Sequence, residues 1–181
     1  MTRRLVVTGP ESTGKTTLAG ALAAQFGAPC LPEAARGYAE ARRAEGRALT
    51  ADDAEPIARA AIAAEDAALA AAPPLLVLDT DLVSTVVYTR HYYGGAPAWM
   101  EDEARGRRGH LYLLCDVDLP WTPDGVRDRP VARREMYQLF VAALREFDCA
   151  VATVSGAGTA RLETARRAIA ASGVFDSAGR R

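Results

Sequence analysis

Five short apolar runs recur along the chain, each three to six residues long. Runs of this length without polar alternation are typical of strands that are buried on both faces of a sheet. They cover Arg4 to Thr8, Pro29 to Leu31, Leu75 to Leu78, His110 to Cys115 and Ala150 to Val154. The pattern therefore predicts five strands, of which the run at 29–31 is the weakest.

Segments rich in helix-forming residues separate these runs. In the first of them Leu18, Leu22 and Phe26 recur every fourth residue, which places them on one face of a helix. The predicted helices cover Thr16 to Phe26, Glu33 to Glu45, Ala54 to Ala72, Leu82 to Tyr93, Ala98 to Ala104, Arg133 to Phe147 and Thr159 to Ala171. Strands that alternate with helices in this way predict an α/β fold, with a five-stranded, mostly parallel sheet flanked by helices on both faces.

The length of 181 residues fits one domain. We expect this domain to span residues 1–175 and the tail at 176–181 to be frayed. The stretch from Trp121 to Val131 contains two prolines and a glycine that break regular structure, so it is predicted to be a loop. Because the loop follows a strand and precedes a helix, we expect a lid at about 121–134.

The composition of the chain limits the kinds of molecule that it is expected to bind. The net charge of −1 argues against a general binder of nucleic acids or anionic membranes. The start of the chain has no signal-peptide pattern and no run of 18 apolar residues occurs, so a cytoplasmic protein is expected. The three widely spaced cysteines are then interpreted as reduced thiols in buried, apolar strand contexts. Homo-oligomerisation stays open.

A phosphate-binding motif follows the first predicted strand. The residues Gly9-Pro-Glu-Ser-Thr-Gly-Lys15-Thr16 match G-x-x-x-x-G-K-[ST], with a strand before the motif and a helix after it. Its glycines let backbone N–H groups converge on phosphate oxygens, and the helix N-terminus adds a positive potential. The motif predicts binding of Mg·ATP by Gly9, Glu11, Ser12, Thr13, Gly14, Lys15, Thr16 and Thr17, with Thr16 also a ligand of Mg²⁺.

The only lysine of the chain stands in this motif. The sequence contains 21 arginines and one lysine, Lys15, and it has no asparagine. A slender ammonium group fits a tight phosphate nest in which a planar guanidinium would not. Without asparagine the chain cannot contain the Asn-Lys-x-Asp box of a translational-GTPase-like guanine site. Composition and motif together favour an ATP-dependent catalytic role for Lys15.

Two carboxylates close the third predicted strand. Asp79 directly follows the run Leu75 to Leu78, and Asp81 lies two residues on. The carboxyl ends of parallel strands are where such folds bind ligands, so Asp79 is a candidate for Mg²⁺ binding, substrate binding and catalysis, and Asp81 for substrate binding. The alternative is that either residue caps the following helix.

The end of the weak second strand carries a further acid. Glu33, with Arg36 three residues later, occupies the place where a small-molecule kinase would hold the base for an acceptor hydroxyl. We therefore predict that both residues bind the substrate and that Glu33 is catalytic. The alternative is a Glu that stabilises the first turn of a helix, paired with an exposed arginine.

Four arginines lie in or beside the loop at 121–134. Arg127 and Arg129 are predicted to close over the transferring phosphoryl group, with Arg127 catalytic. Arg133 and Arg134 are interpreted as solvated side chains. In the segment after Asp81, Tyr88 and Tyr92 share one helical face, where they could stack on an acceptor base or pack in the core.

Taken together, these stretches resemble a known family. The sequences GPESTGKTTL, PEAARGYAE, LLVLDTDLVSTVVY and DVDLPWTPDGVRDR are similar, in order and spacing, to the ribosylnicotinamide kinase domain of the bifunctional NadR proteins. The resemblance extends over about residues 4–172. It implies the P-loop kinase fold and ATP-dependent phosphorylation of the 5′-hydroxyl of nicotinamide riboside, a step of NAD salvage. By motif position it also implies substrate contacts by Trp121 and Asp124.

The acceptor stays open at this stage. The bifunctional proteins carry an adenylyltransferase domain before the P-loop, whereas eight residues precede Gly9 here, so we do not expect this chain to make the dinucleotide. Its acceptor could instead be another nucleoside, a vitamin or a sugar. A regulatory ATPase that acts on a protein partner is the alternative from a different class.

Overall fold

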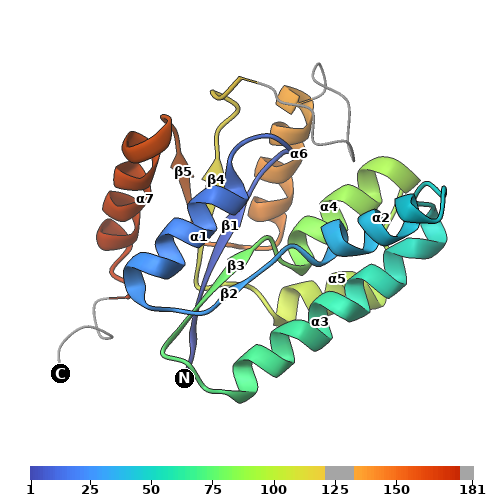
Figure 1. Cartoon of the computed structure of the whole chain (residues 1–181), viewed down its shortest axis with the longest axis horizontal. Coiled ribbons are helices and arrows are strands. Elements are labelled where there is room, and N and C mark those ends of the chain that lie inside the picture. The colour runs from blue at the N-terminus through green and yellow to red at the C-terminus, as the bar shows by residue number, and fades with distance from the viewer. Residues whose placement is uncertain (121–132, 176–181) are drawn as a thin grey trace.

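A five-stranded parallel sheet lies at the centre of the computed structural model, which describes residues 1–120 and 133–175 (Figure 1). The strands are β1 (Arg3–Thr8), β2 (Cys30–Leu31), β3 (Leu75–Asp79), β4 (Leu111–Cys115) and β5 (Val151–Val154). Their order is β2-β3-β1-β4-β5, and every pairing between them is parallel. Val7 is opposite Asp79 in the register of β1 and β3, so the carboxyl ends of these two strands are level.

Helices cover both faces of the sheet. They are α1 (Lys15–Phe26), α2 (Ala34–Ala44), α3 (Ala54–Ala70), α4 (Leu82–Tyr93), α5 (Ala98–Gly106), α6 (Arg133–Glu146) and α7 (Gly158–Ser172), with a short 3-10 helix, η1 (Ala51–Asp53), before α3. Helices α1 and α7 pack on one face, and α3, α4, α5 and α6 contribute to the core on the other. Within the described residues no helix is long and apolar enough to span a membrane.

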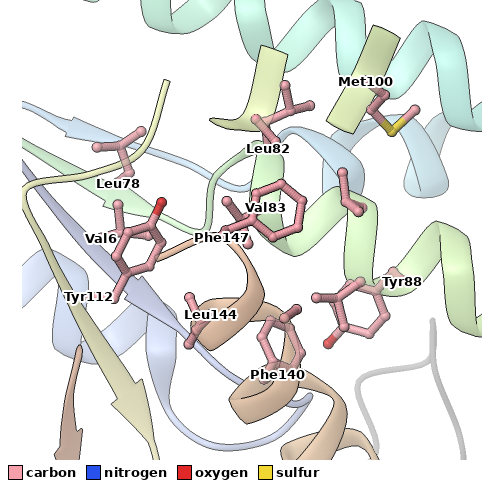
Figure 2. Close-up of a cluster of buried hydrophobic side chains, with 14 of the residues drawn as sticks. Val6, Leu78, Leu82, Val83, Tyr88, Met100, Tyr112, Phe140, Leu144 and Phe147 are labelled. Carbon is pink, nitrogen blue, oxygen red and sulfur yellow. The ribbon is translucent and has the colours of Figure 1, made fainter. Parts of the chain in front are cut away.

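Side-chain alternation along the strands divides the core in two. Leu5 and Val7 of β1 face α1 and α7, whereas Val6, between them, faces the larger layer. In that layer Phe140 of α6 packs beside Tyr88 of α4 (Figure 2). Because both faces of the sheet are buried, the strands read as continuous apolar runs in the sequence.

A buried carboxylate ties α2 to the start of α3. Asp53 Oδ2 accepts a hydrogen bond from the Thr50 backbone N–H at 2.8 Å, and its Oδ1 accepts one from Arg42 Nε at 2.9 Å. The hydroxyl of Tyr38 also donates to Oδ1, at 3.1 Å. These bonds, above all that from the Thr50 backbone, lower the pKa of Asp53 to about 2. These bonds hold α2 against the start of α3. Because Glu33 is the N-cap residue of α2, they also help to fix its position.

The predicted α/β fold is confirmed, and the sheet is parallel throughout the described strands. The weakest predicted strand is the shortest one, β2, which has two residues at one edge of the sheet. The burial predicted for the cysteines is wrong in part. Cys115 is buried in β4, but Cys30 is exposed and Cys149 is half-buried outside any strand. An edge strand of two residues has too few neighbours to bury the Cys30 side chain.

Candidate functional site

The glycine–lysine motif forms the loop between β1 and α1. Gly9 has a φ of +133°, and a Cβ atom there would lie 2.9 Å from the carbonyl oxygen of Cys115. Gly14 has a φ of +75°, and its Cβ would lie 3.1 Å from Leu119 Cδ1. Both positions therefore require glycine, because the loop turns sharply and passes close to β4 and the segment after it.

The side chains of the loop hold its shape from within. Thr13 Oγ1 donates a hydrogen bond to the Pro10 carbonyl at 2.8 Å, and Lys15 Nζ donates to the same oxygen at 2.6 Å. Lys15 is 7% exposed, so its ammonium group lies within the loop. The predicted nucleotide-binding residues from Gly9 to Thr17 thus lie together, in this loop and the first turn of α1.

Thr16, in the first turn of α1, contacts Asp79, the last residue of β3. Thr16 Oγ1 donates a hydrogen bond to Asp79 Oδ2 at 2.6 Å. The other oxygen, Oδ1, is buried and has no hydrogen-bond partner among the described residues. Burial raises the pKa of Asp79, while Thr16 and the charge of Lys15 oppose the rise. A buried oxygen without a hydrogen bond costs free energy of folding. Asp79 Oδ1 is therefore suited to bind a cation or a water molecule on that cation.

The oxygen atoms of this pair fit Mg²⁺. A hydroxyl and a carboxylate are hard donors, and Mg²⁺ usually takes one or two protein ligands together with water and substrate phosphates. Within residues 1–120 and 133–175, no group of three or more His, Cys, Asp and Glu side chains could hold a metal ion. Thr16 and Asp79 stay the candidate ligands that the sequence predicts.

A cleft lies between α2, α3 and α4 at the end of β3, and its lining includes Thr80 and Asp81, the two residues that follow Asp79. Its empty space, open mouth included, is about 880 Å³. The walls combine apolar side chains, three tyrosines and three carboxylates, and none of the described lining residues is basic. The three carboxylates are Glu33, Glu65 and Asp81. The described lining is thus mostly apolar and aromatic, and its charged side chains are acidic.

Glu33 stands at the end of β2, at the N-cap position of α2. Its side chain is 8% exposed and lies 3.9 Å from Arg36, measured from Oε2 to Nε. The charges of both residues act on Asp79, where Glu33 raises the pKa and Arg36 lowers it. The structure therefore brings together Glu33, Arg36 and Asp79, although Arg36 does not line the cleft itself. Its side chain is 44% exposed.

Asp81 combines the two alternatives that the sequence left open. Its Oδ1 accepts a hydrogen bond from the Ser84 backbone N–H at 3.3 Å and so caps α4. Its Oδ2 accepts one from the Tyr112 hydroxyl at 2.5 Å. Burial raises the pKa of Asp81 to about 6. Asp81 is thus a helix cap that also lines the cleft.

Tyr88 belongs to both the core and the cleft, whereas Tyr92 is 38% exposed and lines the cleft without belonging to the core. Their rings are parallel within 7° and their centroids lie 6.2 Å apart. Tyr88 is 8% exposed and packs edge-on against Phe140, with ring centroids 5.6 Å apart. Figure 2 shows the two side chains next to each other. Because Tyr88 also lines the cleft, its packing in the core does not remove it from the candidate site.

Glu65 is a lining residue that the sequence analysis did not single out. It is 4% exposed, and Arg4 Nη1 donates a hydrogen bond to its Oε1 at 2.6 Å. A signal was present, because Glu65 follows the buried Ala58 by seven residues and so shares its helical face. A charged residue on the inner face of a helix indicates a partner or a ligand.

Arg133 was interpreted as a solvated side chain, and this interpretation is wrong. The residue is 7% exposed, and its guanidinium donates to the carbonyl oxygens of Leu119 and Ser12. A buried arginine at the first residue of a helix is held by backbone oxygens brought close in space, which sequence spacing does not reveal. Arg134, by contrast, is exposed as expected.

Four predicted site residues, Trp121, Asp124, Arg127 and Arg129, lie outside the described residues. Their roles at the acceptor and at the transferring phosphoryl group stay predictions. The same holds for the lid at about 121–134, of which residues 133 and 134 are described.

Comparisons with known proteins agree with this geometry. A family model described as an AAA domain matches residues 4–161. The trifunctional NAD biosynthesis/regulator protein NadR of Escherichia coli (strain K12) is 30% identical over 147 residues, which are 80% of this chain and 36% of that protein. NadR of Salmonella typhimurium is 29% identical over the same length. The chain thus spans about a third of the length of these relatives.

Solved structures give the same picture. A crystal structure of NadR in complex with NR superposes with a TM-score of 0.69 at 26% identity, covering 93% of this chain and 50% of that one. Thymidylate kinase from Ehrlichia chaffeensis shares the fold alone, with a TM-score of 0.63 at 14% identity, over 92% of this chain and 98% of that one.

The likeness therefore covers the sheet, the glycine–lysine loop and the helices around the cleft, which all fall within the matched residues. It confirms the resemblance that the motifs carried. The chain belongs to the AAA-domain family, has the P-loop kinase fold, and is similar to the kinase domain of the NadR-type proteins.

Proposed function

We propose that this protein is an ATP-dependent kinase that phosphorylates the 5′-hydroxyl of nicotinamide riboside and so forms nicotinamide mononucleotide. Kinase-type phosphoryl transfer is supported by the similarity to NadR and to thymidylate kinase. The observation that carries the proposal is that Asp79, which is hydrogen-bonded to Thr16, directly precedes Thr80 and Asp81, and these two residues line the cleft together with Glu33.

The charge of the cleft supports this acceptor. The ring of nicotinamide riboside is a pyridinium cation, and a positive ring is stabilised by carboxylates and by the faces of aromatic side chains. The described lining offers both and contains no basic group that would repel the ring. The NadR structure in complex with NR is consistent with this assignment, at 26% identity.

The glycine–lysine loop takes the phosphates of ATP. Backbone N–H groups of the loop and the N-terminus of α1 hold the β- and γ-phosphates, and Lys15 neutralises their charge. Thr16 and Asp79 would hold Mg²⁺, which would supply neutralisation of the phosphate charge. ATP binding then displaces Lys15 Nζ from the Pro10 carbonyl toward the phosphates.

A carboxylate at the border of the proposed nucleotide and acceptor sites accepts the acceptor proton. The 5′-oxygen forms a bond to the γ-phosphorus as the bond from that phosphorus to the β,γ-bridging oxygen breaks, and ADP leaves. Glu33 and Asp79 are the two candidates for the base, and Glu33 is favoured because Asp79 is engaged with Thr16. Most of the acceleration comes from positioning and charge stabilisation.

ADP release, coupled to a spectroscopic readout, tests the proposal with a panel of acceptors. The panel contains nicotinamide riboside, adenosine, uridine, thymidine, pyridoxal and ribose, each with ATP and Mg²⁺. We expect the highest kcat/KM with nicotinamide riboside. Faster release with another member would assign a different acceptor, and an acceptor-independent rate would favour the regulatory ATPase.

A further inference from the structure

Arg133 joins the phosphate-binding loop to the segment that follows β4. Its Nη1 donates a hydrogen bond to the Leu119 carbonyl at 3.0 Å. Its Nη2 donates to the same oxygen at 3.1 Å and to the Ser12 carbonyl at 3.2 Å. One planar guanidinium thus holds backbone oxygens of two segments that lie more than 100 residues apart in the sequence.

The contact with Ser12 bears on the orientation of the loop. In a trans peptide the C=O of one residue and the N–H of the next point in opposite directions. Holding the Ser12 carbonyl toward Arg133 therefore turns the Thr13 N–H to the opposite side. Ser12 has a φ of +53°, a left-handed conformation that costs a non-glycine residue free energy and needs support from its surroundings.

A second contact joins the same two segments. The Cδ1 atom of Leu119 lies 3.1 Å from the place where a Cβ of Gly14 would be, so the Leu119 side chain packs directly on the loop. The guanidinium and the leucine thus hold the loop at two positions. Arg133 is 7% exposed, and its Nε is buried without a hydrogen-bond partner among the described residues. Its burial serves these backbone contacts.

We propose that Arg133 is a positioning residue for nucleotide binding, which holds the Ser12 peptide in the orientation that turns the Thr13 N–H toward the phosphates. Arg133 acts through the loop backbone. The inference rests on the nucleotide half of the proposed function and is independent of the identity of the acceptor.

Titration of the full chain with ADP and with adenosine tests this role, because adenosine lacks the phosphates that the loop would hold. For Arg133→Met we expect the Kd of ADP to rise at least about tenfold, since a charge-assisted hydrogen bond is lost. Adenosine binding and the KM of the acceptor should stay within about twofold. The matched control is Arg134→Met, which removes the neighbouring exposed cation and should change neither constant.

Arg133→Lys separates positioning from charge. A lysine keeps the positive charge but cannot hold both carbonyls in one plane, so we expect it to bind ADP almost as weakly as the methionine variant. Full rescue by lysine, or an equal loss of adenosine binding, would overturn the proposal. If the methionine variant fails to fold, the test is the rate of amide hydrogen exchange in the peptide at 9–16, compared between Arg133→Lys and the wild type. Exchange as slow as in the wild type would contradict the positioning role.

Discussion

Lys15 is the residue on which the proposed binding of ATP most depends. Because it is the only lysine, an amine-selective reagent can modify only Lys15 and the N-terminus. We expect modification to abolish phosphoryl transfer and bound ATP to protect activity, since the ammonium then lies against phosphates. Peptide mass spectrometry measures the extent of modification at Lys15. Full activity after complete modification of this residue would refute its role.

A substitution of Glu33 tests its proposed role in catalysis separately from nucleotide binding. We expect Glu33→Gln to lower kcat about 100-fold or more, because the acceptor proton loses its base, while the Kd of ATP stays unchanged. Glu40→Gln is the matched control, since this glutamate is exposed on the same helix, α2. Initial rates and nucleotide titrations measure the two effects. Equal loss of kcat and ATP affinity would show that Glu33 is structural.

Lys15 and Glu33 could be singled out from the sequence because each follows the end of a predicted strand at a short, fixed distance. Arg133 was missed because no local pattern marks it, and Glu65 was missed although its seven-residue spacing from the buried Ala58 was a signal. Glu65 is paired with Arg4, 61 residues away, and Arg133 is held by a backbone oxygen 121 residues away. Their partners are set by tertiary packing, which a single sequence does not display.

At the scale of single elements, α4 connects the core to the cleft through its cap. Asp81 has its pKa raised to about 6 from an ordinary value of 3.8, mainly by burial. Between about pH 4 and pH 6 the folded protein therefore binds a proton that the unfolded chain has lost, and stability falls as the pH rises through this window. Above pH 6 the cost of the buried charge is fully present.

Asp81→Asn tests this linkage. Asparagine keeps the capping oxygen and carries no charge, while its amide NH₂ replaces the oxygen that accepts from the Tyr112 hydroxyl, so that hydroxyl would have to accept a hydrogen bond there. We expect the variant to gain about 2 to 3 kcal/mol relative to the wild type between pH 4 and pH 7, from urea unfolding at both values. Asp66→Asn should change in the opposite sense and less, because Arg107 lowers the pKa of the exposed Asp66. A pH-independent difference for Asp81→Asn would contradict the account.

The elements themselves were predictable to within one or two residues. Leu18 and Leu22 recur with helical spacing and are buried in α1, and the run at 75–78 forms the buried part of β3. The exposure of Cys30 was not predictable, because its surroundings depend on the place of β2 at the sheet edge. The apolar pattern therefore predicts which helices and strands form. How far the side chains of an edge strand are buried depends on the order of the strands in the sheet.

At the scale of the whole molecule, the strand order brings together the glycine–lysine loop and the cleft. Because β1 lies between β3 and β4, the loop after β1 meets Asp79 on one side and Leu119 on the other. The cleft then follows on the β3 side, where β2 brings Glu33 to the same edge of the sheet. The strand order thus places the glycine–lysine loop and the cleft at the same edge of the sheet, which the proposed kinase reaction requires.

Phosphorus-31 NMR of the reaction tests the central claim most directly. The full chain is incubated with ATP, Mg²⁺ and nicotinamide riboside, and the fate of the γ-phosphate is followed. The account predicts a new phosphomonoester signal, coupled to the 5′-methylene protons, that grows in step with ADP. Inorganic phosphate in step with ADP, without any phosphomonoester, would contradict the account and identify an ATPase.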